Sequence, residues 1–349
     1  MTIIQHLLID QYGAFLGKHS ERLIVTKGEE KIAQAPLLHL ESVTIANQGV
    51  SLSAEAVREC TERGIPIFFI SGTGTAYASL YSAGLTGTVA TRRAQLEALN
   101  TIRGLNLVLA FGMGKLQNQS NLLKYMAKYR KEADPALFEE LRLCADEILD
   151  HLIEMEWIKN YPEFQDGTVT VNDLRQELMG IEGRGAQRYW KAIKQILPEK
   201  YKFTGRTRRG ATDPVNSALN YAYGILYGQI ERSLVLAGLD PYAGFLHVDR
   251  PGKPSLTLDF IEEFRPVVVD RTIFGLANKN VEFEQNDEKL LTKETRRMLA
   301  EKINERLDSN GLYEGKRYPL RAIIQMQARH IATFLRAERA SYEPFGMSW

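Results

Sequence analysis

The stretch IPIFFISGTGTAYASLYSAGLTGTVATRRAQLEALNTIRGLNLVLAFG, residues 65–112, contains the change of pattern that decides the fold. Its start, Ile65–Ile70, is a compact apolar run of strand length, whereas apolar residues in Ala90–Gly112 recur at i, i+3 and i+4, as on one face of a helix. Between them, Gly84–Gly87 is a connection rich in glycine and threonine. The sequence therefore predicts an α+β protein, with a small β-rich domain at residues 1–85 and a larger all-α domain at residues 86–349.

The sequence before residue 65 is typical of short strands joined by turns. ERLIVTKG (21–28) and LLHLESVTIA (37–46) are rich in β-branched and aliphatic residues and are separated by turn residues. One helix is predicted among these strands, because Ser53 is a suitable N-cap, AEAVRECTER follows it and Gly64 would end it.

The sequence after residue 112 continues the helical pattern. The i, i+3, i+4 spacing of apolar residues recurs in SNLLKYMAKYRKEA (120–133), PALFEELRLCADEILDHLIEMEW (135–157) and PVNSALNYAYGILYGQIERSLVLAG (214–238). The sequence contains no internal repeat or low-complexity tract. We therefore expect the second domain to be helical throughout.

Composition excludes several classes of protein. With 349 residues, 44% hydrophobic and 25% charged, the chain is typical of a soluble globular protein. The start MTIIQHLLIDQYGAF lacks the features of a secretory leader, and no apolar run has the length of a membrane span, so we expect a cytoplasmic protein. Cys60 and Cys144 lie in helical contexts far apart and are predicted to be buried thiols. The net charge of +1 gives no global indication of nucleic-acid binding.

The segment GFLHVDRPGKPSLTLDFIEEFRP, residues 244–266, combines a histidine with three acids in mostly apolar surroundings. Asp259 and Glu262 are three residues apart, and on a helix such carboxylates are neighbours that repel unless a cation holds them. With His247 they would suit Mg²⁺ or Mn²⁺, with Zn²⁺ as a further option. Spacing alone does not distinguish Glu262 from Glu263, and Arg265 is an alternative partner that would need no metal.

Glu182 is a further candidate ligand, since Gly180 and Gly183 beside it would let a backbone or ligand approach closely. Alternatively, Glu182 and His247 are ordinary polar residues of the fold. The sequence has no GxxxxGK[ST], GxSxG or HExxH motif, and ISGTGTA lacks the third glycine of a dinucleotide site. The tyrosines of NYAYGILYG (Tyr221, Tyr223 and Tyr227) have helical spacing, which favours a place in the core over a role as nucleophile.

Two local clusters of basic residues are candidate DNA-binding surfaces. Arg206, Arg208 and Arg209 lie in FTGRTRRG, which contains no acid. The second cluster recurs at helical spacing in GRGAQRYWKAIK and consists of Arg184, Arg188, Lys191 and Lys194. Both clusters would bind phosphates without much sequence specificity. Alternatively, the arginines of the first cluster pair with acids such as Glu199 or Asp213.

The order of these motifs resembles that of the CRISPR-associated protein one family, the adaptation endonuclease and integrase. Residues 203–271 resemble its signature region, and residues 49–81 are similar to its N-terminal domain. In that family a glutamate in an EG segment, a histidine in a G-x-LH segment and an aspartate opening a D-x-x-E helix hold the metal. The resemblance places these roles on Glu182, His247 and Asp259, with Glu262 as a nearby helper acid.

One departure from the family pattern follows the arginine pair: Gly210 and Ala211 stand where the family often has two prolines. The resemblance implies a homodimer formed through the β domains and a small ferredoxin-like partner that bridges two such dimers. It also implies insertion of short foreign DNA into a CRISPR repeat array, an antiviral defence, by attack of a 3′ hydroxyl on a phosphodiester. The alternatives are a metal-dependent nuclease that only degrades DNA, and a non-catalytic DNA-binding assembly subunit whose acids pair with arginines.

Overall fold

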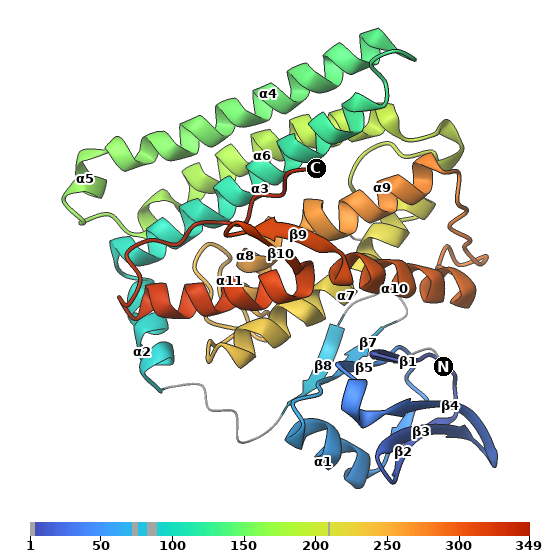
Figure 1. Ribbon diagram of the computed structural model, residues 1–349. Helices are drawn as coiled ribbons and strands as arrows, with labels where there is room; N and C mark the ends of the chain where they lie inside the picture. Colours follow the sequence, from blue (N-terminus) through green and yellow to red (C-terminus); the bar gives the residue numbers. More distant parts are fainter. Residues whose placement is uncertain (1–3, 72–75, 82–88, 209) are drawn as a thin grey trace.

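The computed structural model describes residues 4–71, 76–81, 89–208 and 210–349 (Figure 1). The predicted connection Gly84–Gly87, the glycine-containing segment 72–75 and Arg209 lie outside these ranges. Strands fill residues 6–80 and a largely helical region follows, which confirms the predicted α+β class. No helix in the described ranges is both long enough and apolar enough to cross a membrane.

The N-terminal part contains two four-stranded sheets. One has the order β1-β5-β7-β8, in which β7 and β8 are antiparallel and the other neighbours are parallel. Its strands are His6–Ile9, Ser42–Ile45, Ile67–Ile70 and Ala76–Leu80. The other has the order β4-β3-β2-β6 and is antiparallel except for the β2–β6 pair. Its strands are Glu30–Pro36, Arg22–Lys27, Ala14–His19 and Ser51–Leu52.

Helix α1 (Ala54–Glu62) forms where the sequence predicted it. The Ser53 side chain accepts a hydrogen bond from Ala56 N at 3.1 Å, and Gly64 follows with a φ of 69° that glycine adopts readily. Cys60 on this helix is buried and free, as is Cys144 in the helical region. The two sheets and α1 enclose an apolar cluster of their own, separate from the core of the helices.

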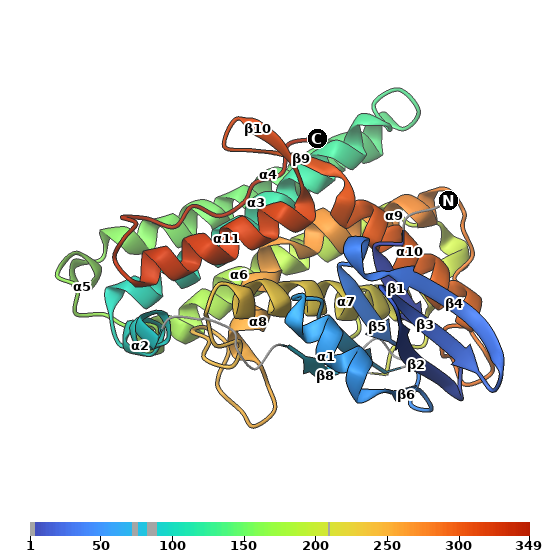
Figure 2. The ribbon, with the colours of Figure 1, turned by 60° about the horizontal axis from the view of Figure 1, so that its bottom comes forward.

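The helical region is built from long helices around one large apolar core. Its main helices are α2 (Val89–Ala98), α3 (Ile102–Lys128), α4 (Pro135–Trp157), α6 (Val171–Ile196), α7 (Pro214–Leu236), α10 (Lys293–Asp308) and α11 (Leu320–Leu335). Shorter segments connect them: α5 (Pro162–Gln165), α8 (Ser255–Phe260), the 3-10 segments η2 (Ile158–Asn160), η3 (Glu199–Tyr201) and η4 (Ile261–Glu263), the π segment η5 (Arg265–Asp270) and α9 (Arg271–Asn278). Helix α7 contacts β7 and β8, whereas α4 lies on the outside of α3 and α6, away from the sheets (Figures 1 and 2).

The helical region also contains a hairpin, so the prediction that it is all-α was wrong in this detail. Strands β9 (Asn310–Tyr313) and β10 (Lys316–Pro319) pair through a two-residue turn at Glu314 and Gly315. Both turn residues have positive φ, 47° and 78°, as a type I′ turn requires. Because that turn usually carries Asn-Gly or Asp-Gly, Glu-Gly gave no hairpin signal in the sequence.

Candidate functional site

Two acids from different elements meet at one buried lysine. Lys115, on α3, lies with its Nζ against Glu182 Oε1 of α6 and 2.7 Å from Glu262 Oε2 of η4. Lys115 and Glu262 are almost completely buried, with exposed fractions of 7% and 5%. Arg265 forms an ion pair with the other oxygen of Glu262, Oε1. The result is a buried network of two carboxylates and two cations.

Two glycines allow the three elements to approach one another at this point. A Cβ atom on Gly185 of α6 would lie 2.3 Å from the Leu116 side chain, and one on Gly114 would lie 2.9 Å from Cγ of Glu263. A larger residue at either position would separate the elements that carry Lys115, Glu182 and Glu262. No backbone approaches Gly180 or Gly183 closely, since added Cβ atoms there would meet only Arg184 at 3.5 Å or nothing within 4 Å, and the predicted approach of a ligand stays a prediction.

The charges in this network keep each other ionised. Burial alone would lower the pKa of Lys115, but the two glutamates more than offset it and raise that pKa. Burial would likewise raise the pKa of Glu262, whereas Arg265 and Lys115 hold it well below its usual range. Glu262 Oε2 is buried and has no partner in hydrogen-bond geometry, although Lys115 Nζ is near. This oxygen therefore interacts with a cation without forming a regular hydrogen bond.

Asp259 and His247 form a second unit, which fixes the loop before α8. Asp259 Oδ2 accepts hydrogen bonds from Phe245 N (2.7 Å) and Leu246 N (3.1 Å). Its Oδ1 accepts one from His247 N (3.0 Å) and lies 2.6 Å from His247 Nδ1. Because Asp259 holds Nδ1, the other imidazole nitrogen, Nε2, is left for another partner, as in histidines that bind metals.

Local packing explains how this loop keeps its shape. Gly244 lies directly against the start of α8, since a Cβ atom there would be 2.5 Å from the Ser255 carbonyl carbon. Gly244 N donates to Ser255 Oγ at 2.8 Å. Arg175, two turns before Glu182 on α6, donates to the Leu246 carbonyl. The loop that carries His247 is therefore attached both to α8 and to the helix that carries Glu182.

Asp259 and Glu262, which the sequence spacing predicted to be close neighbours in one site, have different partners in the structure. Asp259 and Glu262 were predicted to share a cation, but every oxygen of Asp259 is bonded to the 245–247 loop, while Glu262 faces Lys115 and Arg265. Among the described residues, no three His, Cys, Asp or Glu side chains gather in a metal-binding arrangement. The pair that converges on a cation is Glu182 and Glu262, and the predicted alternative partner, Arg265, is present in addition.

Glu263 is distinguished from Glu262 by its direction. Its carboxylate accepts hydrogen bonds from Tyr342 Oη and, at 3.0 Å, from Phe345 N, and so it faces the C-terminal segment. Asn118 holds the same segment through Phe345 O and Met347 N. Burial raises the pKa of Glu263 to about 8, and the hydrogen bond from Tyr342 only partly offsets it. Glu263 therefore serves the packing of this segment and not the cation network.

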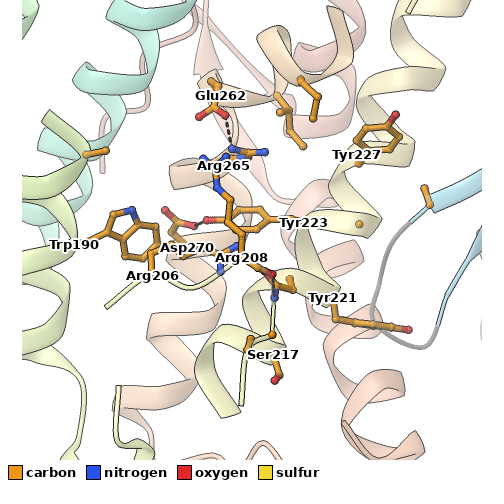
Figure 3. A pocket seen from close by; sticks show the side chains of 18 of the residues that line it. Trp190, Arg206, Arg208, Ser217, Tyr221, Tyr223, Tyr227, Glu262, Arg265 and Asp270 are labelled. Carbon is orange, nitrogen blue, oxygen red and sulfur yellow. Dashed lines mark hydrogen bonds and ion pairs between the residues drawn. The ribbon is translucent and has the colours of Figure 1, made fainter. Parts of the chain in front are cut away.

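A pocket of about 890 Å³ adjoins the network and is lined by Lys115, Glu262 and Arg265 among others (Figure 3). Tyr223 lies in its wall between two guanidinium groups, with Arg206 and Arg265 at 5.3 Å and 5.1 Å from the ring centroid. Asp270 accepts hydrogen bonds from Tyr223 and Tyr189, and its burial raises its pKa to about 6.

The tyrosines therefore differ from the prediction in part. Tyr221 is completely buried, as expected for a core residue. All three tyrosines nevertheless line the pocket, and Tyr223 and Tyr227 are partly exposed. Their helical spacing could not distinguish a pocket wall from a core.

Two members of the first basic cluster, Arg206 and Arg208, line the same pocket. Arg206 donates to Asn216 Oδ1 (3.0 Å) and Asn220 Oδ1 (2.6 Å), and Arg208 is exposed at the pocket rim. The predicted alternative partner Asp213 instead caps α7, by accepting from Asn216 N at 2.9 Å. Gly210 has a φ of 67°, which a proline cannot adopt, so a proline at this position would not fit the loop as it is found here.

The second basic cluster is paired with acids of α4. Arg184 contacts Glu154, Arg188 Nε lies 3.4 Å from Glu147 Oε2, and Lys191 Nζ lies 3.9 Å from Glu140 Oε1. These side chains are between about one third and three fifths exposed. Three of the four basic residues of this cluster are therefore paired with α4 carboxylates, whereas Lys194 is exposed, and the role of the cluster in DNA binding stays a prediction.

Sequence analysis missed Lys115, the residue that links the two acids. A lysine within the mainly apolar LVLAFGMGKLQ segment of a buried helix was the available signal, since a charged residue in such a place needs a partner. Asp270 was missed as well, because VVVD ends an apolar run and gives no sign of the two tyrosines that bond to it.

Known proteins include relatives that match nearly the whole chain. A family model described as CRISPR associated protein Cas1 matches residues 7–305. A CRISPR-associated endonuclease Cas1 of Archaeoglobus fulgidus is 34% identical over 354 residues, which cover 98% of this chain and 99% of the relative. One of Francisella tularensis subsp. novicida is 31% identical and covers 99% of this chain and 100% of the relative.

Solved structures share the fold at lower identity. A casposase bound to integration product superposes with a TM-score of 0.80 at 21% identity and covers 97% of this chain and 93% of that one. A CAS1 protein from Thermotoga maritima has a TM-score of 0.76 at 20% identity, with coverage of 97% and 99%. A Cas6-RT-Cas1–Cas2 complex has a TM-score of 0.73 at 20% identity and covers 99% of this chain but 37% of that one.

Proposed function

The chain belongs to the CRISPR-associated protein Cas1 family, and we propose that it is a metal-dependent DNA endonuclease and integrase that inserts short DNA segments into a CRISPR array. The observation that carries this proposal is the convergence of Glu182 and Glu262 on a single cation beside a pocket with further cations. Family membership supports the endonuclease activity, because the curated relatives are named CRISPR-associated endonucleases.

We assign the metal to Glu182, Glu262 and Nε2 of His247, which do not form a metal-binding arrangement in the metal-free chain and would have to converge when the ion binds. This set of two carboxylates and one imidazole suits Mn²⁺ or Mg²⁺. Asp259, which the sequence resemblance placed among the ligands, is here a positioning residue that orients His247 through Nδ1. When bound, the metal would polarise the scissile phosphate and activate the attacking oxygen.

The remaining residues of the site would bind and orient DNA. Arg208 and Arg206 at the pocket would contact phosphates and hold the strand. Arg265 neutralises Glu262 and would also lower the negative charge that an incoming phosphate meets. In joining, a 3′ hydroxyl forms a new phosphodiester while the target strand loses one, so no covalent link to the protein is needed.

We propose that the partners are DNA, a second copy of this chain and a small Cas2-like protein. The name of the Cas6-RT-Cas1–Cas2 complex among the structural neighbours supports the last of these. The homodimer, formed through the β-rich residues 1–85, stays a prediction. Its test is the sedimentation of the full chain with and without substitutions on the exposed faces of the two sheets.

The experiment that tests the function uses a labelled duplex with a free 3′ hydroxyl and a target that contains the repeat. With Mn²⁺ or Mg²⁺ and the small partner, we expect a labelled product longer than the substrate, and none from a 3′-deoxy duplex. Shortened products alone would indicate a nuclease that only degrades DNA. DNA binding without any product, and without metal binding, would indicate an assembly subunit.

A further inference from the structure

Lys115 occupies a place in which few lysines are found. It lies in the middle of α3 with an exposed fraction of 7%, and its ammonium group contacts the carboxylates of Glu182 and Glu262. A buried ammonium is costly unless it is paired, so these two contacts account for its presence in the fold. No other hydrogen bond or ion pair of the Lys115 side chain is found in the described part of the chain.

The charges around Lys115 balance without a metal. Glu182 and Glu262 contribute two negative charges, and Lys115 and Arg265 contribute two positive charges. Arg265 is also held by the Tyr223 ring and contacts the outer oxygen of Glu262, whereas Lys115 lies between the two acids. Of the two cations, Lys115 is the one whose ammonium occupies the space between the proposed metal ligands.

A divalent cation would need the same carboxylate oxygens at about 2.0 to 2.2 Å. Lys115 Nζ is already 2.7 Å from Glu262 Oε2 and in contact with Glu182 Oε1, so both cations cannot keep these contacts. The side chain of Lys115 also lines the large pocket, which gives its flexible stem a direction in which to move.

We propose that Lys115 is a built-in counterion that takes the cation position between Glu182 and Glu262 in the metal-free protein and is displaced when a divalent cation binds. The inference rests on the proposed function, since it concerns the metal of that site. Lys115 then stabilises the metal-free fold and weakens metal binding at the same time. A metal ion that binds at this site must therefore compete with the ammonium group of Lys115.

The test compares Lys115→Met, which keeps the length of the side chain but removes its charge, with the wild-type chain. Binding of Mn²⁺ is followed by calorimetry and by the electron paramagnetic resonance of free Mn²⁺. We expect Lys115→Met to bind Mn²⁺ at least about tenfold more tightly, because the ion then no longer has to break the buried ion pairs of the ammonium with the two carboxylates, which is costly. Without metal the variant should melt at a lower temperature, and Mn²⁺ should raise that temperature more than in wild type.

Two controls make the comparison specific. Lys124→Met removes a lysine of the same helix whose Nζ lies 2.9 Å from Asp146 Oδ1, outside the network, and should leave Mn²⁺ affinity at the wild-type value. Lys115→Arg keeps the charge and should bind Mn²⁺ no more tightly than wild type. If Lys115→Met does not fold, Lys115→Gln provides the uncharged variant.

Equal or weaker Mn²⁺ binding by a folded, uncharged variant, with normal binding by wild type, would overturn the inference and leave the proposed function intact. Lys115 would then serve to position the two acids. Absence of Mn²⁺ and Mg²⁺ binding in wild type itself would instead overturn the proposed function, and with it this inference. The two failures are therefore distinguished by the wild-type titration alone.

Discussion

Glu262 and Glu263 are neighbours in the chain and both are buried, but their surroundings differ in charge. Glu262 faces Lys115 and Arg265, whereas Glu263 faces a tyrosine hydroxyl and a backbone N–H of the C-terminal segment. Accordingly the pKa of Glu262 is lowered and that of Glu263 is raised to about 8. The partner supplied by a distant part of the chain, and not burial or position in sequence, decides which of the two is an ionised ligand candidate.

The largest expected effect separates these two neighbours. We expect Glu262→Gln to lower DNA joining by more than about 100-fold, because loss of a metal ligand should exceed the roughly 10- to 100-fold cost of losing a residue that only supports a ligand. Glu263→Gln is the matched control, the same chemical change one residue away, and should join DNA at close to the wild-type rate. Joining assays with purified full-length chains measure both. Similar losses in the two variants would mean that the change acts through packing of η4.

A second prediction concerns Asp259, the other buried acid of the segment. Asp259→Asn should weaken Mn²⁺ binding by about 10- to 100-fold without abolishing it, because His247 loses its orienting carboxylate but keeps Nε2. Titration of Mn²⁺ gives both the affinity and the number of bound ions. A loss as complete as that of Glu262→Gln would restore Asp259 to the ligand role that the sequence resemblance implied.

The different surroundings of Asp259 and Glu262 also show how much of the site could be predicted from the sequence. His247, Asp259 and Glu262 were found because they lie within 16 residues of one another in an apolar segment. Their division into one unit around the 245–247 loop and another around Lys115 depends on α3, whose Lys115 lies more than 140 residues before Glu262 in the chain. Periodicity predicts which residues face inward, but it does not predict which helices meet there.

The fold was more accessible because its signals are local. The change from strand to helix texture around residues 65–112 and the cap at Ser53 follow from short-range patterns, and both appear in the structure. The β9–β10 hairpin was missed because its turn, Glu314 and Gly315, is an unusual choice for two residues of positive φ. The pairing of α6 with α4 was missed because it requires knowledge of which helices pack together.

A third prediction extends the comparison from buried acids to exposed arginines. Replacing Arg206 and Arg208 by Ala should lower the slope of log K against log salt by about 0.9 for each phosphate of duplex DNA that the variant no longer neutralises. The matched pair Arg184 and Arg188, replaced in the same way, should change the slope little, because α4 acids already neutralise them. Titrations of one labelled duplex at several salt concentrations compare the variants, with melting temperatures to show that both remain folded. A larger change for the α6 pair would mean that DNA displaces the α4 acids.

The smallest expected effect is a change in stability with pH at Glu263. Its pKa rises from an ordinary 4.5 to about 8 on folding, so between these values the folded chain binds more protons than the unfolded chain. The stabilisation of the fold by proton binding to Glu263 is therefore fully present below pH 4.5 and is lost as the pH rises towards 8. Glu263→Gln, which is neutral at every pH, should match wild type near pH 5 and exceed it in melting temperature near pH 8.5.

The informative quantity is the sign of the difference in melting temperature between wild type and Glu263→Gln. The other titrating groups are the same in both chains, so their effects cancel in this difference. Glu262→Gln should behave differently: since the cations lower the pKa of Glu262, its charge stabilises the fold above pH 4.5, and the variant should be less stable than wild type by a constant amount there. Melting curves of the three metal-free chains from pH 5 to pH 8.5 measure both differences. A constant gap between wild type and Glu263→Gln over this range would mean that Glu263 keeps the same charge throughout, and that the C-terminal segment does not hold it in its neutral form.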